Sequence, residues 1–188
     1  MTDTIKDDFL VEKAKGGDSG AFRLLYERHR SAIFRFLYRL SGSAEVAEDI
    51  THDCFLNLIR GSGKSQVGAP ASVRTQLYST ARTLAMEYFR NSGQEPFDWD
   101  LAKDEVVLGR EQPLNRILDQ RSASEVREAI ASLPPLEREA FVFFEYEGLK
   151  LGEIATIVGT DLETLTARLE RSRQQIRNTL ASDPHSNR

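Results

Sequence analysis

The stretch LGEIATIVGTDLETL occupies residues 151–165. Gly159 permits a tight turn between two helical patterns, and Asp161 can cap the second pattern. Apolar residues on both sides of the turn are spaced to pack together: Ile154, Ala155, Val158, Leu162, Leu165 and Leu169. The pattern predicts a helix-turn-helix, whose second helix fits the roughly 12 Å wide major groove of DNA. A plain helical hairpin that packs only for stability has the same pattern, so this alternative stays open.

Helical periodicity extends towards both ends of the chain from this motif. Asp18 and Ser43 are placed to cap helices, Pro70 suits a first helical turn, and Pro134–Pro135 forces a break. The expected helices cover about 19–40, 44–60, 70–90, 122–133, 136–146, 151–158 and 162–181. Turn formers and acidic residues fill 92–112. The sequence therefore predicts an all-α protein with two small helical domains, 1–91 and 113–188, joined by a flexible acidic linker over 92–112.

Composition excludes several classes of protein. The 188 residues include 29 acidic, 25 basic and one cysteine, so an internal disulfide and a cysteine-based metal framework are excluded. The apolar runs are too short to span a bilayer, and no signal peptide is visible, which indicates a cytoplasmic protein without membrane insertion. His52 and Cys54 have too few possible partners for a metal or thiol-enzyme site, and we expect no cofactor. Gly61–Ser65 ends in Gly-Lys-Ser but lacks the first glycine of a phosphate-binding loop, so no enzyme is expected.

Charge is segregated along the chain. Residues 22–39 hold five arginines and one glutamate, whereas residues 41–59 hold four acids and no lysine or arginine. Basic residues dominate again in 60–90 and 162–180, and acids dominate in 91–111. Solvated helix faces produce such alternation, but the blocks match whole expected helices. The segregated blocks are also compatible with two separate surfaces, an acidic one for a basic protein partner and a basic one for phosphates.

Three stretches resemble the bacterial extracytoplasmic-function sigma factors, the group IV members of the sigma-70 family. They are LVEKAKGGD at 10–18 with Ala21 and Phe22, AEDITHDCF at 47–55, and LPPLEREA at 133–140 continuing through Glu147-Gly148-Leu149 into the helix-turn-helix. With residues 78–90 they cover nearly everything except the ends and the linker. The resemblance implies a transcription initiation factor that binds core RNA polymerase and promoter DNA, without catalytic chemistry of its own. An anti-sigma factor is a further implied partner.

In that family, an acidic helix docks on a coiled-coil of the large polymerase subunit. The matching positions are Glu48, Asp49, His52, Asp53 and Phe55. A helix that carries carboxylates and an apolar anchor suits a basic partner surface, which agrees with the charge pattern. For Phe55, ordinary core packing is an equal alternative.

Opening of the −10 element is implied for the loop at about 60–71 and the helix after it. A flipped base needs a pocket, and the single strand needs a basic surface. The candidates are Lys64, Arg74, Arg82, Thr83 and Arg90. Tyr78 and Tyr88 are stacking candidates, but core packing is the simpler interpretation. Gln76 stands where relatives usually have Trp, and Thr83 replaces a common Asn, which bears on melting and on −10 preference.

The −35 element is implied to contact the last helix. The base-facing positions are Thr166, Ala167, Glu170 and Arg171, with Thr164 and Arg168 nearer the DNA backbone. Arg171 can grip guanine O6 and N7, and Glu170 can accept from cytosine N4. Alternatively, Glu170 pairs only with a neighbouring arginine such as Arg173. Relatives often carry a basic residue in place of Thr166, so the target sequence does not follow from the family.

The linker is implied to thread the RNA exit path, where Asp98, Asp100, Asp104 and Glu105 would mimic the charge of RNA. Trp99 lies among them and can dock on a neighbouring domain. Two other functions are compatible with the sequence. One is a sigma-like decoy that does not melt promoters, and the other is a stand-alone helix-turn-helix regulator.

Overall fold

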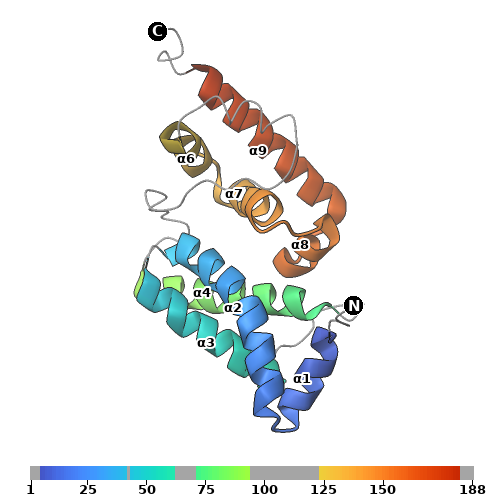
Figure 1. The fold of residues 1–188 in the computed structure, drawn as a ribbon. Helices are drawn as coiled ribbons and strands as arrows, with labels where there is room; N and C mark the ends of the chain where they lie inside the picture. Colours follow the sequence, from blue (N-terminus) through green and yellow to red (C-terminus); the bar gives the residue numbers. More distant parts are fainter. Residues whose placement is uncertain (1–4, 42, 62–70, 94–122, 183–188) are drawn as a thin grey trace. The chain divides into compact units, whose positions relative to one another are not determined.

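The computed structural model describes residues 5–41, 43–61, 71–93 and 123–182, and every regular element in these ranges is a helix (Figure 1). The chain divides into two compact units. The first contains α1 (Asp7–Lys15), α2 (Ser19–Ser41), α3 (Ala44–Arg60) and α4 (Val73–Ser92). The second contains α6 (Ala123–Ala131), α7 (Pro135–Phe141), the π-helical turn η2 (Val142–Tyr146), α8 (Leu151–Val158) as far as Ala155, and α9 (Leu162–Ser182). The all-α prediction is confirmed.

Helix α2 is the centre of the first unit and packs against α1, α3 and α4. Its buried face follows helical spacing and consists of Ala21, Leu25, Ile33, Phe36, Leu37 and Leu40. The Phe36 ring meets Tyr78 of α4 edge-on, with ring centroids 5.3 Å apart. Each fully buried large apolar side chain contributes roughly 1.5–3 kcal/mol, so this interior holds the three long helices together.

Local capping groups determine where α2 and α3 begin. Asp18 Oδ1 accepts hydrogen bonds from the backbone N–H groups of Gly20 and Ala21, at 2.9 and 3.0 Å. Ser43 Oγ accepts from the backbone N–H of Val46 at 3.3 Å. Both caps were predicted, and they satisfy backbone donors that have no partner inside the helix.

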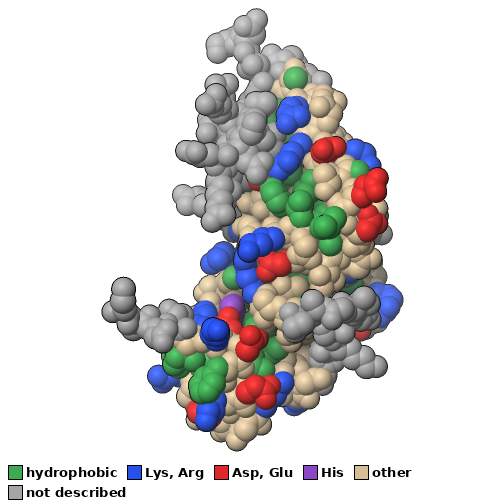
Figure 2. Space-filling view, turned by 90° about the vertical axis from the view of Figure 1, so that its right-hand side faces the viewer, with side chains coloured by type: hydrophobic (Ala, Val, Ile, Leu, Met, Phe, Trp, Pro, Cys, Tyr) green, Lys and Arg blue, Asp and Glu red, His purple; other side chains and the backbone are tan. Residues whose placement is uncertain are grey.

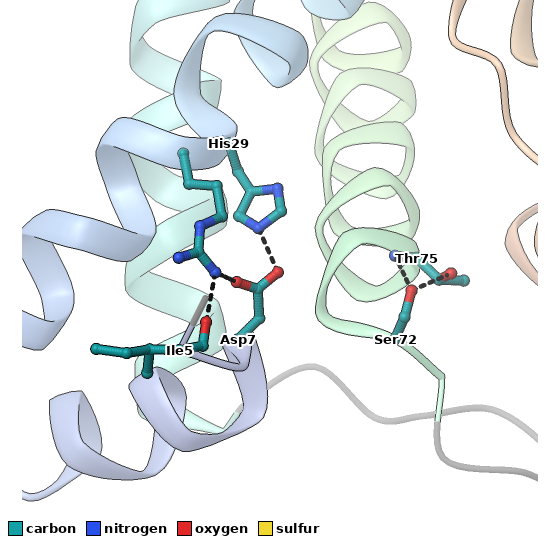
Figure 3. Close-up of polar contacts among 6 residues, drawn as sticks. Ile5, Asp7, His29, Ser72 and Thr75 are labelled. Carbon is teal, nitrogen blue, oxygen red and sulfur yellow. Dashed lines mark hydrogen bonds and ion pairs between the residues drawn. The ribbon is translucent and has the colours of Figure 1, made fainter. Parts of the chain in front are cut away.

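Helix α4 begins later than predicted. Ser72 Oγ accepts from the backbone N–H of Thr75 at 3.1 Å, which makes Ser72 the N-cap and Val73 the first helical residue (Figure 3). The expectation of a start near Pro70, which itself lies outside the described residues, was therefore wrong. A serine hydroxyl at the N-cap accepts from an N–H that has no partner inside the helix, whereas proline at N1 supplies no such acceptor.

The short helix α1 was not predicted, and its contacts with α2 explain its position. Asp7 forms an ion pair with Arg28, and Asp7 Oδ2 lies 2.7 Å from His29 Nε2 (Figure 3). Arg28 also donates to the backbone carbonyl of Ile5 at 2.9 Å. The half-buried ring of His29 thus faces a carboxylate. These contacts fix the start of α1 against the middle of α2.

In the second unit, α6 and α7 both pack against the long helix α9. The predicted helix over 136–146 is helical, but its last turn is widened into η2, where the N–H of Glu147 donates to the carbonyl of Val142 at 3.1 Å. Phe141, Val142 and Phe143 are all fully buried in this segment. The wider turn adds one residue per turn, which brings three consecutive apolar side chains and Glu145 into the interior.

Candidate functional site

A tight turn joins α8 to α9 as the helix-turn-helix prediction required. Gly159 has φ of 71°, in the left-handed region that side-chain-bearing residues rarely adopt, and its N–H donates to the carbonyl of Ala155 at 3.0 Å. Asp161 Oδ1 accepts from the N–H of Thr164 at 2.7 Å, and Asp161 Oδ2 accepts from Thr164 Oγ1 at 2.8 Å. These two hydrogen bonds lower the pKa of the Asp161 carboxyl, so its charge persists at the start of α9.

Helix α9 has one buried and one exposed face. The buried face holds Leu165, Leu169, Ser172, Ile176 and Leu180. Among the predicted base-facing residues, Thr166, Glu170 and Arg171 are exposed, whereas Ala167 is half-buried. Of the two predicted backbone contacts, Arg168 is half-buried and Thr164 uses its hydroxyl to bond Asp161. The structure therefore brings three of the predicted −35 residues together on one surface.

Two carboxylates, one on α7 and one on η2, bind arginines of α9. Neither contact was predicted from the sequence. Glu137 of α7 pairs with Arg171, and Glu145 of η2 pairs with Arg173 at 2.8 Å. The Arg173 guanidinium also lies over the Phe144 ring, 5.2 Å from its centroid. Arg173 therefore binds the buried Glu145, and not Glu170, the alternative partner that the sequence suggested. No spacing rule links residues 28 and 34 positions apart.

On α4, the predicted −10 residues are spread over several faces. Arg90 and Thr83 are exposed, whereas Arg74 and Arg82 are half-buried. The Arg74 guanidinium lies 5.7 Å from the centroid of the Tyr78 ring. Tyr78 is only 1% exposed, so it belongs to the core and cannot stack on a base.

Gln76 and Thr83, the two departures from the family pattern, make local hydrogen bonds on α4. The Gln76 side chain donates to the Ala71 carbonyl at 2.7 Å, just before the helix begins. Thr83 Oγ1 donates to the Ser79 carbonyl at 3.0 Å. Tyr88 is half-buried and its ring meets Phe89 edge-on. Lys64 lies outside the described residues, as do most of the expected base pocket, Trp99 and the four linker acids.

The predicted acidic helix corresponds to α3 and presents a ridge. We call Asp49, His52 and Asp53 the α3 ridge, because all three are exposed and their spacing places them on one side of the helix. Glu48 is directed towards α2, where its Oε1 accepts from Arg30 at 2.5 Å. This hydrogen bond is the main reason that the pKa of Arg30 is raised. Glu48 is therefore partly neutralised within the unit and is not a freely available docking charge.

Phe55 is a correction to the docking prediction. Its side chain is 0% exposed, and its ring meets Tyr26 and Phe22 edge-on, with centroids 4.8 and 6.5 Å apart. An apolar anchor must reach the surface to contact a partner, and this ring does not. The neighbouring Cys54 is also fully buried, and burial raises the pKa of its thiol to about 12.

Two features are absent from the part of the chain that the structure describes. Within those ranges, no group of three or more metal-ligating side chains comes together, and no helix is both long and apolar enough to cross a bilayer. Acidic and basic side chains lie beside one another on the surface of the second unit (Figure 2). The candidate sites are three surfaces: the α3 ridge, the exposed face of α9 and the exposed part of α4.

Comparisons with known proteins match both units. A family model described as sigma-70 region 2 matches residues 25–95, and one described as sigma-70, region 4 matches residues 123–176. The chain is 32% identical over 162 residues to the ECF RNA polymerase sigma factor SigE of Mycolicibacterium smegmatis. That match covers 84% of this chain and 60% of the relative. This chain is also 27% identical to the RNA polymerase sigma-H factor of Pseudomonas aeruginosa, over 91% of this chain and 92% of that relative.

Solved structures with low sequence identity share the fold. CnrH in complex with the cytosolic domain of CnrY has a TM-score of 0.64 at 18% identity, with 94% of this chain and 98% of that chain covered. RpoE in complex with the anti-sigma factor NepR, from Bartonella quintana, has a TM-score of 0.60 at 19% identity, with 86% and 98% covered. At these identities, the likeness supports the helical fold alone.

Proposed function

This chain belongs to the sigma-70 family of RNA polymerase sigma factors, in its extracytoplasmic-function group, and we propose that it binds core RNA polymerase and directs the enzyme to promoters. The observation that carries the proposal is the presence of both family regions, in order, on two separate helical units. In this role the polymerase forms the phosphodiester bonds, and the chain supplies binding and strand separation in the cytoplasm.

The work divides between the two units. Residues 1–91 bind core polymerase through the α3 ridge and meet the −10 element through α4. Residues 113–188 contact the −35 duplex through the exposed face of α9, and 92–112 connect the two. A stand-alone helix-turn-helix regulator would need only the second unit, so it leaves the region 2 match unexplained. An anti-sigma factor is a further partner, since solved relatives of the same fold include complexes with anti-sigma proteins.

The α3 ridge is the surface to test for polymerase binding. Its two exposed carboxylates, Asp49 and Asp53, have no ion-pair partner within the described residues, so their charge is available to a basic partner. Replacing both with arginine reverses the local field without touching the core. We expect the affinity of this double variant for core polymerase, compared by co-purification at low salt, to fall by more than about tenfold. Close charge pairs across an interface contribute on the order of 1.5 kcal/mol or more.

The control makes the same change in charge elsewhere on the unit. Glu12 on α1 and Glu27 on α2 are both exposed, and their double replacement by arginine should leave polymerase binding within about twofold of the native chain. Retention of full polymerase binding by the Asp49→Arg, Asp53→Arg variant would refute the role of the ridge. Run-off transcription with purified core enzyme then separates an initiation factor from a decoy, because only the former yields transcripts from a selected promoter.

A further inference from the structure

An ion pair joins α7 to the exposed face of α9. Glu137 Oε1 accepts from Arg171 Nε at 3.1 Å and also lies 3.1 Å from Arg171 Nη2. The Glu137 side chain is 16% exposed, whereas that of Arg171 is 59% exposed. The carboxylate is therefore held largely within the protein surface, and the guanidinium extends from it into solvent.

The pairing uses only one edge of the guanidinium. Arginine has five N–H donors in a rigid fork, and Glu137 contacts the edge formed by Nε and Nη2. Arg171 makes no other polar contact within the described residues, so Nη1 and the outer N–H of Nη2 remain available. These atoms form the end of the fork that grips guanine O6 and N7 in a bidentate contact. The ion pair and the base contact can thus exist together.

The position of Glu137 is itself well determined. It lies in the first turn of α7, two residues after Pro135, and α7 packs against α9. The first turn of a helix favours a negative charge, so a glutamate suits this position. Eight residues later in the chain, Glu145 of η2 pairs with Arg173 of α9, and the Glu145 side chain is only 4% exposed. The two pairs join α9 to α7 and to η2 at neighbouring points.

Removal of the Glu137 carboxylate has two consequences of opposite direction. A free arginine side chain has many rotamers, and ordering it on binding has a cost in conformational entropy. Glu137 meets part of that cost before DNA arrives, which favours the specific contact. A carboxylate beside a phosphate surface also repels DNA of any sequence. Loss of Glu137 should therefore weaken discrimination between bases while leaving non-specific binding unchanged or stronger.

We propose that Glu137 is a positioning residue that orients Arg171 for recognition of a base in the −35 duplex. This inference rests on the proposed function and extends it to a residue outside the recognition helix. The pair is exposed on the arginine side, so it contributes little to folding stability. A change in sequence preference without a change in folding is what separates this role from a merely structural one.

The test uses the full chain bound to core polymerase. A −35 duplex is first selected from a random library, and binding is then compared with duplexes that carry each single base-pair change. Arg171→Ala identifies the base pair that Arg171 reads, where we expect the native chain to discriminate by about tenfold or more. Glu137→Ala should reduce this discrimination to within about threefold, with affinity for non-specific duplex unchanged or increased. Glu137→Gln retains an acceptor at Oε1 and should give an intermediate value.

Glu128→Ala is the matched control, because Glu128 is an exposed acid of the second unit that lies on α6, outside the exposed face of α9. It should preserve discrimination at that base pair. In the Arg171→Ala background, Glu137→Ala should cause no further loss of discrimination at that base pair. The inference is overturned if Glu137→Ala discriminates between bases as well as Glu128→Ala, or if the double variant loses more discrimination than Arg171→Ala alone. Absence of any −35 preference in the native complex would instead refute the proposed function, and the inference with it.

Discussion

Replacement of Phe55 with alanine distinguishes a core residue from a docking residue. The Phe55 side chain is fully buried, and its ring is enclosed by the rings of Tyr26 and Phe22. Truncation of a buried phenylalanine to alanine costs roughly 3–5 kcal/mol, because the lost transfer free energy is added to the cost of the cavity. The Phe55→Ala variant should therefore destabilise the first unit by about that amount.

The neighbouring Cys54 provides a probe of this unit alone. It is the one cysteine in the chain, it is fully buried, and its thiol pKa is raised to about 12. At about pH 8 a thiol reagent can modify it only after the unit opens, because the thiolate is the reactive form. At 1.4 kcal/mol for each tenfold change, a loss of 3–5 kcal/mol predicts labelling that is roughly 10² to 10⁴ times faster.

Phe9→Ala is the matched control, because Phe9 lies in the same unit and is 54% exposed. Its labelling rate should stay within about threefold of the native rate. A steep dependence of the Phe55→Ala rate on urea would show that the whole unit opens, and not only the site beside Cys54. The reasoning is wrong if Phe55→Ala labels no faster than Phe9→Ala and yet loses polymerase binding, since Phe55 would then be a docking residue.

Two further predictions concern pH. Burial raises the pKa of Cys54 above the ordinary value of 9.0 to about 12, so the folded unit holds this proton when the unfolded chain has lost it. The contribution of this proton to the free energy of unfolding is complete below about pH 9 and declines by roughly 1.4 kcal/mol per pH unit towards pH 12. Cys54→Ala should remove this decline from the free energies of unfolding measured with urea at several pH values. An unchanged decline would contradict the assignment. The pKa of Asp161 is lowered from 3.8, so its contribution is present above that pH and is lost as the pH falls below it. Asp161→Ala should lower the Tm of the second unit at neutral pH, and the difference from the native chain should narrow in acid; a constant difference would argue against the charge of the cap as the cause.

Helix positions could be predicted where the determining residues are close in sequence. Asp18, Ser43 and Asp161 each accept a hydrogen bond from a backbone N–H two or three residues away, and the predicted starts of α2, α3 and α9 coincide with the structure. Gly159 likewise ends α8 through its own backbone conformation. Apolar spacing then indicated which face of each helix is buried. These features depend on interactions within one helical turn, which the sequence displays directly.

Other features depend on residues far apart in the chain. Helix α1 is held by Asp7 against Arg28 and His29, and neither spacing nor periodicity predicts those contacts. Burial of Phe55 follows from the position of α2 across α3, although its residue type suits a core and an anchor equally well.

The same holds at the recognition helix. The sequence by itself determined that α9 carries exposed polar residues beyond a capped turn, because capping and periodicity are local. Glu137 lies beside Arg171, 34 positions away in the sequence, only because α7 packs on α9. That packing is decided by the buried apolar side chains of other residues. The partner of an exposed charge is therefore a consequence of how the buried faces fit, and a single sequence does not encode it in any local pattern.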